Sequence, residues 1–259
     1  MYPYISIFGK NVGTYGLCMA TGVILAICLA MLKAKKKNIS PWDILIVGAA
    51  AIGAAVICGG LMYTFVTFPL DEIIRQVLAG NFAAISGGIV FYGGLIGGIL
   101  GGILGVRIAG CNTGRLMSCV VPFIPIGHAI GRVGCLMAGC CHGFEYDGFL
   151  AVYYPNSLTG LPADQGYFPI QPLESLVNLV IFGLLLCYEK RAKRDYDMLF
   201  AYLGCYAVGR FGLELLRGDS IRGIYFGLSV SQWISIGMLV ACAVYFLLGL
   251  RKAKNQQPQ

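Results

Sequence analysis

The sequence predicts an all-α integral membrane protein: a seven-transmembrane-helix bundle with a small external head segment. Of the 259 residues, 58% are hydrophobic and 12% are charged, and the mean hydropathy is +0.76. Soluble domains carry about 25% charged residues, so this composition excludes an ordinary soluble protein. The apolar runs are long and continuous, which favours membrane-spanning helices over the short alternating segments of membrane strands.

Seven apolar runs are long enough to cross a bilayer as helices. We expect the spans at residues 13–32, 43–66, 85–108, 116–137, 172–186, 198–216 and 228–250. Residues 139–168 are the one long non-apolar stretch and form the predicted external head, with its tyrosines at the level of the lipid headgroups. Residues 68–84 are predicted to form another external segment, which is partly amphipathic. The chain 1–259 is expected to be a single membrane domain.

Basic side chains cluster directly after three of the predicted spans. They are Lys33, Lys35, Lys36 and Lys37 after the first span, Lys190, Arg191, Lys193 and Arg194 after the fifth, and Arg251, Lys252 and Lys254 after the last. Positive charge beside spans marks cytoplasmic loops, so we expect the N-terminus outside and the C-terminus in the cytoplasm. The net charge of +7 is therefore a topology signal, and the expected partners are membrane lipids, not nucleic acid.

The third span contains the string FYGGLIGGILGGILG, in which glycine pairs recur every four residues, at 93–94, 97–98 and 101–102. Such a repeat is typical of a ridge against which a neighbouring helix packs closely. For the first pair another interpretation stays open. Tyr92, Gly93 and Gly94 would also let a lipid headgroup approach the backbone.

Two prolines, Pro122 and Pro125, fall inside the fourth span. Proline kinks or breaks a helix, and a broken helix is tolerated in a membrane where it lines a cavity. His128 and Arg132 follow this break directly. We therefore expect these two side chains near the outer leaflet, beside a cavity.

Polar residues spaced i, i+4 and i+7 predict a charged stripe on each of two helices. The stripes are His128, Arg132 and Cys135 in the fourth span, and Arg210, Glu214 and Arg217 in the sixth. Arginine is costly at membrane depth and binds phosphate through a planar fork of donors, so an anionic phospholipid headgroup is the predicted ligand. Fixed arginines would also stabilise a departing phosphate, with His128 or a tyrosine as general base and Glu214 orienting an arginine. The alternative is an ion-pair network that only fixes helix register.

The cysteines carry a weaker signal. None of the 11 forms a C-x-x-C pair, which disfavours a thiol–disulfide enzyme. Cys135, Cys140, Cys141 and His142 match no standard zinc spacing, and we expect small-residue packing or a turn there. A thiolate–imidazole metal set and a nucleophilic cysteine activated by Arg132 remain alternatives. No metal and no cofactor is assigned to the chain.

Five strings occur in an order that is similar to one known family. They are TYGL near the start, FYGGLIGG, the frame P-x-G-x-x-x-G-R-x-G-x-x-x-x-G-x-x-x-G from Pro125 to Gly143, P-x-Q-x-x-E from Pro169 to Glu174, and GRFGLELLR. Over nearly its whole length the chain resembles the prolipoprotein diacylglyceryl transferases. The resemblance implies a multi-pass transferase of the bacterial plasma (inner) membrane, acting in lipoprotein biosynthesis. Such enzymes move the diacylglyceryl group of phosphatidylglycerol onto the lipobox cysteine in the signal peptide of a prolipoprotein.

The resemblance also implies roles for single residues: Arg132 as the lipid-binding arginine, Arg217 as an essential arginine, Tyr15 and Glu174 as site residues, and Gly134, Gly139 and Gly143 as signature glycines. Together with the residues derived above, the predicted catalytic residues are His128, Tyr92, Arg217 and Tyr15. The predicted substrate-binding residues are Arg132, Arg210, Glu174, Glu214, Gly93, Gly94, Gly134, Gly139 and Gly143.

The signature departs from the family at three points. The family's histidine before G-G-L is Tyr92, its asparagine after G-R-x-G is Cys135, and its N-G-E element reads A-G-C at 138–140. We hypothesise that His128 supplies the basicity lost at Tyr92. Two other functions stay open, namely a divergent paralogue with the same lipid donor and another acceptor, and a non-enzymatic lipid or anion transporter. The predicted outward clustering of the functional charges favours the enzyme over the transporter.

Overall fold

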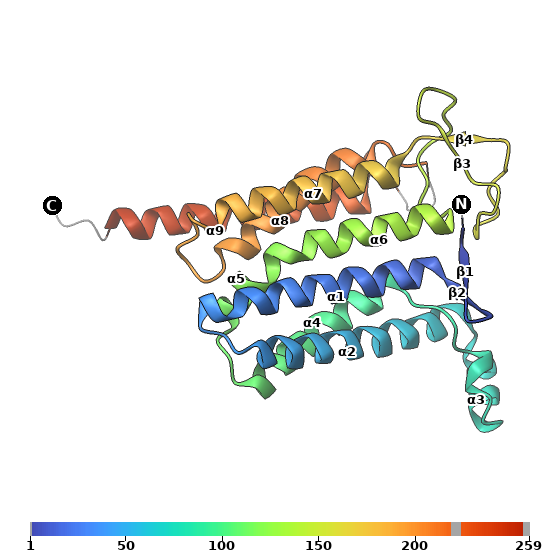
Figure 1. Ribbon diagram of the computed structural model, residues 1–259, viewed down its shortest axis with the longest axis horizontal. Coiled ribbons are helices and arrows are strands. Elements are labelled where there is room, and N and C mark those ends of the chain that lie inside the picture. Colours follow the sequence, from blue (N-terminus) through green and yellow to red (C-terminus); the bar gives the residue numbers. More distant parts are fainter. Residues whose placement is uncertain (1, 219–223, 256–259) are drawn as a thin grey trace. The chain divides into compact units, whose positions relative to one another are not determined.

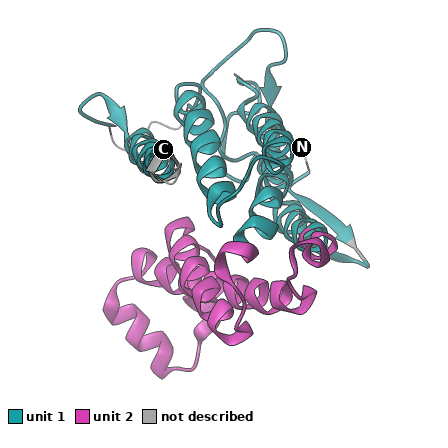
Figure 2. Ribbon diagram, turned by 90° about the vertical axis from the view of Figure 1, so that its left-hand side faces the viewer, with its two compact units in different colours: residues 1–29, 117–259 teal, residues 30–116 magenta. Residues whose placement is uncertain are grey.

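The computed structural model describes residues 2–218 and 224–255 (Figure 1). The chain divides into two compact units (Figure 2). Unit 1 combines Met1–Leu29 with Met117–Gln259, and unit 2 is Ala30–Leu116. The expectation of a single membrane domain stays a prediction.

Helices dominate both units. In chain order they are α1 (Thr14–Ala34), α2 (Pro41–Thr67), α3 (Leu70–Leu78), α4 (Phe91–Ala109), α5 (Thr113–Val120), α6 (Ile124–Ala138), α7 (Ile170–Tyr188), α8 (Asp197–Glu214) and α9 (Val230–Asn255), with short 3-10 turns η1 (Lys35–Lys37), η2 (Phe82–Ala84) and η3 (Val121–Phe123). The strands form three antiparallel pairs: β1 (Tyr4–Ile7) with β2 (Lys10–Gly13), β3 (Val152–Tyr153) with β4 (Gly166–Tyr167), and β5 (Ile224–Tyr225) with β6 (Leu228–Ser229).

Six helical segments of the described chain are long and apolar enough to cross a membrane. They correspond to the predicted spans one to five and seven, which confirms an all-α membrane protein. The predicted sixth span is α8, whose 18 residues include Asp197, Arg210 and Glu214. Its charges set it apart from the other six, and its crossing of the membrane stays a prediction.

The third and fourth spans differ in detail from the sequence pattern. The third begins at Phe91 instead of residue 85, because residues 85–90 are not helical: Gly87 takes φ 150 and Val90 is extended. The fourth is interrupted by η3, which contains Pro122, and Pro125 stands in the first turn of α6, so the predicted break is confirmed.

In unit 1, α6 packs against α7, α7 against α8 and α8 against α9 (Figure 1). The contact between α6 and α7 is the most extensive of the three. Val121, Ile181, Leu185 and Met198 form a buried apolar cluster at one end of this packing. The β1–β2 hairpin and the head at 139–168 lie at the opposite end (Figure 1). The first turns of α7 lie between this cluster and the head.

In unit 2 the helices α2 and α4 form the principal contact. Gly93, Gly97, Gly101 and Gly105 are buried on one face of α4. A Cβ atom at Gly97 would lie 2.4 Å from the carbonyl oxygen of Ala54, and one at Gly101 2.3 Å from that of Ala50. The first glycine of each predicted pair therefore forms the packing ridge. The second glycines have space, with nothing within 4 Å of a Cβ at Gly102.

This difference within a pair yields a direct test. Gly101→Ala should destabilise the protein by about 1–3 kcal/mol, the usual cost of overpacking a close contact. Gly102→Ala, one residue further along, should be neutral or slightly stabilising because alanine is the better helix former. Thermal unfolding of both purified variants in the same detergent measures the difference, and equal midpoints would contradict the close α2–α4 contact.

Candidate functional site

A buried carboxylate, Glu174 near the start of α7, binds three arginines. Its Oε2 lies 2.8 Å from Nε of Arg132, and its Oε1 lies 3.2 Å from Nη1 of Arg210 and 3.4 Å from Nη1 of Arg217. The side chains of Glu174 and Arg217 are each only 3% exposed. Arg210 also pairs with Glu214 at 2.5 Å. The structure thus joins both predicted stripes at one carboxylate.

Helices α6 and α8 carry two of the arginines to Glu174, and the chain after α8 carries the third. Arg132 projects from α6, and the packing of α6 on α7 is fixed by a 3.0 Å hydrogen bond from the Ser175 hydroxyl to the Ala129 carbonyl. Arg210 and Glu214 lie one turn apart on α8, as the i, i+4 spacing predicts.

Arg217 is not on the helical face where the sequence places it. Helix α8 ends at Glu214, so the i+7 position of the predicted stripe falls beyond the helix. Arg217 instead forms a β-bridge with Gly143 at the start of the head. The chain at Gly143 has room for no larger residue, since a Cβ there would lie 2.6 Å from the Phe168 carbonyl oxygen. Backbone pairing with the head therefore positions this arginine.

A small cavity adjoins the ion pairs. Its volume is about 10 Å³, enough for roughly one water molecule. Its polar lining consists of His128, Arg132, Glu174, Asn178, Tyr206 and Arg210. His128 and Arg132 both line this cavity, as the sequence predicts. Their position near the outer leaflet stays a prediction. A cavity of this volume is too small for a lipid headgroup.

The sequence interpretation missed two residues of this lining. Asn178 is buried, and its Nδ2 donates to the Glu174 carbonyl at 2.7 Å. The Tyr206 ring lies 5.7 Å from the His128 ring. Both stand one turn from a site residue, Asn178 after Glu174 and Tyr206 before Arg210. A polar residue at that spacing within an apolar span was the available signal.

Helix α1 packs closely on α6 through glycines. A Cβ at Gly134 would lie 3.3 Å from the Tyr15 backbone, and one at Gly22 2.7 Å from the Gly127 carbonyl oxygen. Small residues at these positions allow the two backbones to approach. This contact sets Tyr15, which is half exposed, beside the last turns of α6.

The head folds back over the end of α6. Gly139 ends that helix with φ 68, and its carbonyl accepts hydrogen bonds from the hydroxyls of Ser157 at 2.8 Å and Thr159 at 3.0 Å. Gln171 is fully buried and donates to the Cys140 carbonyl at 2.8 Å, while its Oε1 accepts from Tyr154 at 2.9 Å. Burial raises the pKa of Tyr154 to about 12, so its hydroxyl keeps the proton that it donates.

Tyr92, Gly93 and Gly94 belong to unit 2, whereas the Glu174 site belongs to unit 1. Tyr92 is about half exposed, and Gly93 faces α2, with 2.7 Å between its would-be Cβ and the Cys58 carbonyl oxygen. No atom lies closer than 3.7 Å to a Cβ at Gly94. The roles predicted for these three residues in lipid binding and catalysis stay predictions.

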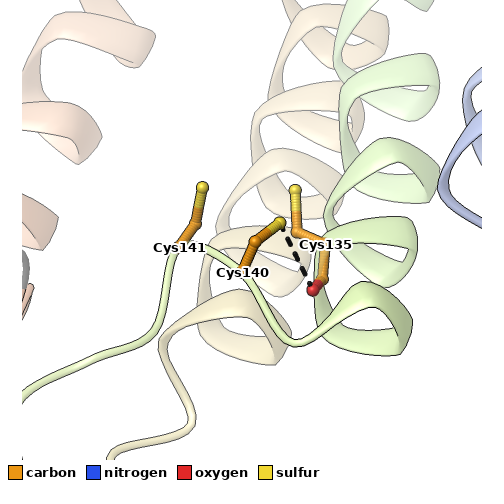
Figure 3. A group of neighbouring side chains, drawn as sticks. All are labelled: Cys135, Cys140 and Cys141. Carbon is orange, nitrogen blue, oxygen red and sulfur yellow. Dashed lines mark hydrogen bonds between the residues drawn. The ribbon is translucent and has the colours of Figure 1, made fainter. Parts of the chain in front are cut away.

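Three cysteines gather where α6 meets the head. The sulfur atoms of Cys135, Cys140 and Cys141 all lie within 4.8 Å of one another (Figure 3). Hydrogen bonds from the Cys135 and Cys140 thiols lower the pKa of Cys141, and the positive charges of Arg217 and Arg132 lower it further, against the effect of burial. His142 is turned elsewhere, with Nδ1 2.8 Å from the Gly143 carbonyl oxygen and its ring against Tyr167.

Replacing Glu174 should cost far more stability than replacing an exposed glutamate. Glu174→Gln leaves three arginines without their shared buried countercharge, and we expect a loss of about 3–5 kcal/mol. The control is Glu72→Gln on α3, where Glu72 pairs with the exposed Arg75, and its expected cost is below about 1 kcal/mol. Chemical or thermal unfolding in detergent measures both. A Glu174→Gln protein as stable as the control would show that the ion pairs do not hold the helices together.

Comparison with known proteins places the chain among named relatives. A family model described as "Prolipoprotein diacylglyceryl transferase" matches residues 3–248. A Clostridium perfringens protein named "Phosphatidylglycerol--prolipoprotein diacylglyceryl transferase 2" is 28% identical over 251 residues, covering 96% of each chain. Proteins named "Phosphatidylglycerol--prolipoprotein diacylglyceryl transferase" are 29% identical in Clostridium tetani, over 90% of this chain and 92% of that one, and 33% identical in Streptococcus pneumoniae, over 89% and 88%. The chain therefore belongs to the prolipoprotein diacylglyceryl transferase family.

Proposed function

We propose that this protein transfers the diacylglyceryl group of phosphatidylglycerol to the lipobox cysteine of a prolipoprotein. The observation that carries the proposal is the gathering of Arg132, Arg210 and Arg217 at Glu174 within a membrane protein of this family. Relatives that match nearly end to end are named for the same reaction. Buried arginines in a membrane are expensive, and a phosphate ligand gives them a function beyond helix packing.

The donor's phosphate is the natural competitor of the Glu174 carboxylate. Both are anions with oxygens that match the guanidinium fork. The cavity holds roughly one water molecule, so the headgroup enters only when the arginines give up contacts to Glu174. Phosphate bound by Arg132 and its neighbours then carries the growing negative charge as the glyceryl carbon–oxygen bond breaks. Glycerol phosphate is the leaving group.

The acceptor thiol needs a base, and His128 is the residue best placed to serve. It stands in the cavity wall with Arg132 and Arg210. Imidazole is the most common general base in proteins, and removal of the thiol proton produces the thiolate that attacks the glyceryl carbon. The new sulfur–carbon bond replaces the carbon–oxygen bond to phosphate. This role compensates for the tyrosine at position 92.

The proposed orientation puts the site on the outer side of a bacterial plasma membrane. Lysines follow α1 directly at 35–37, which favours a cytoplasmic end for that helix and an outside N-terminus. Tyr15 at the other end of α1 adjoins Gly134 beside the site. The site and the head thus share the side from which a secreted prolipoprotein presents its signal peptide.

Substitution of Arg132 by lysine tests phosphate recognition. Arg132→Lys keeps the charge and removes the fork, and transfer should fall roughly 100-fold, the usual cost of losing one transition-state donor. The control is Arg194→Lys, because Arg194 pairs with Asp197 through Nε at the same 2.8 Å but away from the cavity. The assay measures the mass gained by a lipobox peptide in nanodiscs containing phosphatidylglycerol, and in parallel the rescue of a transferase-depleted bacterium.

The outcomes separate the open functions. Equal activity of the two arginine variants would remove Arg132 from the lipid site. Release of glycerol phosphate without peptide modification would indicate the paralogue with another acceptor. Lipid or anion flux without either product would indicate the transporter.

The two histidines of the chain form a matched pair for testing the base. His128→Gln should lower transfer by a factor of roughly 100–10,000, the range for loss of a general base. His142→Gln should leave it near the wild-type rate, because His142 faces Tyr167 and not the cavity. Full activity of His128→Gln would show that another group takes the thiol proton.

A further inference from the structure

The cysteine cluster is arranged more like a set of ligands than like core packing. Cys135, Cys140 and Cys141 come from the last turn of α6 and the chain just after it, and their sulfurs lie within 4.8 Å of one another (Figure 3). A tetrahedral zinc ion with zinc–sulfur bonds of about 2.3 Å holds its sulfurs about 3.8 Å apart. The three sulfurs therefore need to shift by only about 1 Å to share one ion.

The backbone fixes this arrangement in advance. Gly139 ends α6 in the left-handed conformation, and the Cys140 N–H donates back to the Cys135 carbonyl at 3.2 Å while the Gly139 N–H donates to Leu136 at 3.3 Å. This helix ending brings the residue after the glycine against the residue five positions earlier. Cys140 thus returns to Cys135 although four residues separate them.

An unfavourable φ angle at Cys141 places its side chain beside those of Cys135 and Cys140. Its φ is 56°, which a residue other than glycine adopts only at a cost of order 1–3 kcal/mol. The hydrogen bond from Gln171 to the Cys140 carbonyl holds the preceding residue in place. The three sulfurs are therefore positioned by surrounding structure and not by their own packing.

We propose that Cys135, Cys140 and Cys141 bind one Zn²⁺ ion as thiolates and leave its fourth coordination position open. Thiolates are preferred zinc ligands, and three protein ligands with an open position are the arrangement of zinc sites that act on a substrate. Zinc with three thiolates carries one net negative charge. Arg132 stands one turn before Cys135 on α6, and Arg217 forms a β-bridge with Gly143, two residues after Cys141, so two positive charges flank the cluster. The site thus compensates electrostatically for a complex that would otherwise be costly to bury.

The open position has a use that rests on the proposed transferase function. An incoming lipobox thiol becomes the fourth ligand, and its proton passes to the general base His128, because zinc strongly lowers the pKa of a thiol that it binds. Its sulfur then attacks the glyceryl carbon of phosphatidylglycerol. The sulfur–carbon bond forms, the carbon–oxygen bond breaks, and its electron pair leaves on glycerol phosphate, while zinc is neither oxidised nor reduced. Arg132, which contacts Glu174, belongs to the same helix as Cys135 and is the residue proposed to bind the departing phosphate.

Metal analysis of the full-length protein tests the site without any activity assay. Protein purified under reducing conditions, stripped and reloaded with zinc, should hold one ion per chain after desalting, and cobalt loading should give the absorption of tetrahedral thiolate ligation. Cys135→Ser, Cys140→Ser and Cys141→Ser should each weaken binding by more than about 100-fold, since loss of even an outer partner costs 10–100-fold. The matched control is Cys187→Ser, an exposed lone cysteine on α7, which should bind like the wild type.

A second measurement on the wild type covers variants that fail to fold. Zinc should protect all three cysteines from alkylation, read residue by residue by mass spectrometry, and a chelator should remove the protection. Unchanged alkylation with and without zinc, binding of copper(I) alone, a disulfide under the same reducing conditions, or equal zinc content in the serine variants would each overturn the site.

The activity assay on the same samples separates the site from its use. Chelation should lower peptide modification at least tenfold, within the range typical of disturbed metal centres, and zinc should restore it. Bound zinc with activity unchanged by chelation would overturn the activation of the acceptor thiol and leave the transferase standing. Bound zinc with no transfer under any condition would overturn the proposed function and leave the metal site standing.

Discussion

The Glu174 carboxylate is the interaction on which the site depends. It is almost fully buried and receives arginines from α6, from α8 and from the chain after α8. Removal of charge from water is so expensive that none of these groups would remain in the membrane interior alone. Each therefore fixes the others, and the packing of α6, α7 and α8 follows from the one shared anion. A lipid phosphate is also an anion that accepts hydrogen bonds from arginine. In the proposed function it can therefore replace the Glu174 carboxylate at the same arginines.

Much of the fold follows from the lengths of the apolar runs and from the positions of proline and glycine within them. Six spans, the break at Pro122 and the glycine ridge on α4 are visible in the sequence because each depends on residues close together in the chain. The predicted start of the third span is wrong by six residues, because residues 85–90 are mostly apolar but not helical, with Gly87 at φ 150. Hydropathy alone does not distinguish that segment from a helix.

The site was predictable in composition but not in geometry. The i, i+4 spacing identified Arg132 and His128 as neighbours on one helix, and Arg210 and Glu214 on another. It failed for Arg217, whose place is set by a backbone bridge to Gly143, a contact between segments more than 70 residues apart. The cysteine cluster had a local signal after all. A glycine four residues after Cys135 predicts the helix ending that returns Cys140 to it, but nothing local indicates where Cys141 points.

In the proposed mechanism, the phosphate of phosphatidylglycerol replaces Glu174 at the arginines. An experimental structure of the protein in nanodiscs containing phosphatidylglycerol and a lipobox peptide whose cysteine is replaced by serine tests it most directly. We expect phosphate oxygens within hydrogen-bonding distance of Arg132 and of Arg210 or Arg217, with fewer contacts from Glu174 to these arginines. A lipid phosphate bound elsewhere, with all three arginines still on Glu174, would contradict it.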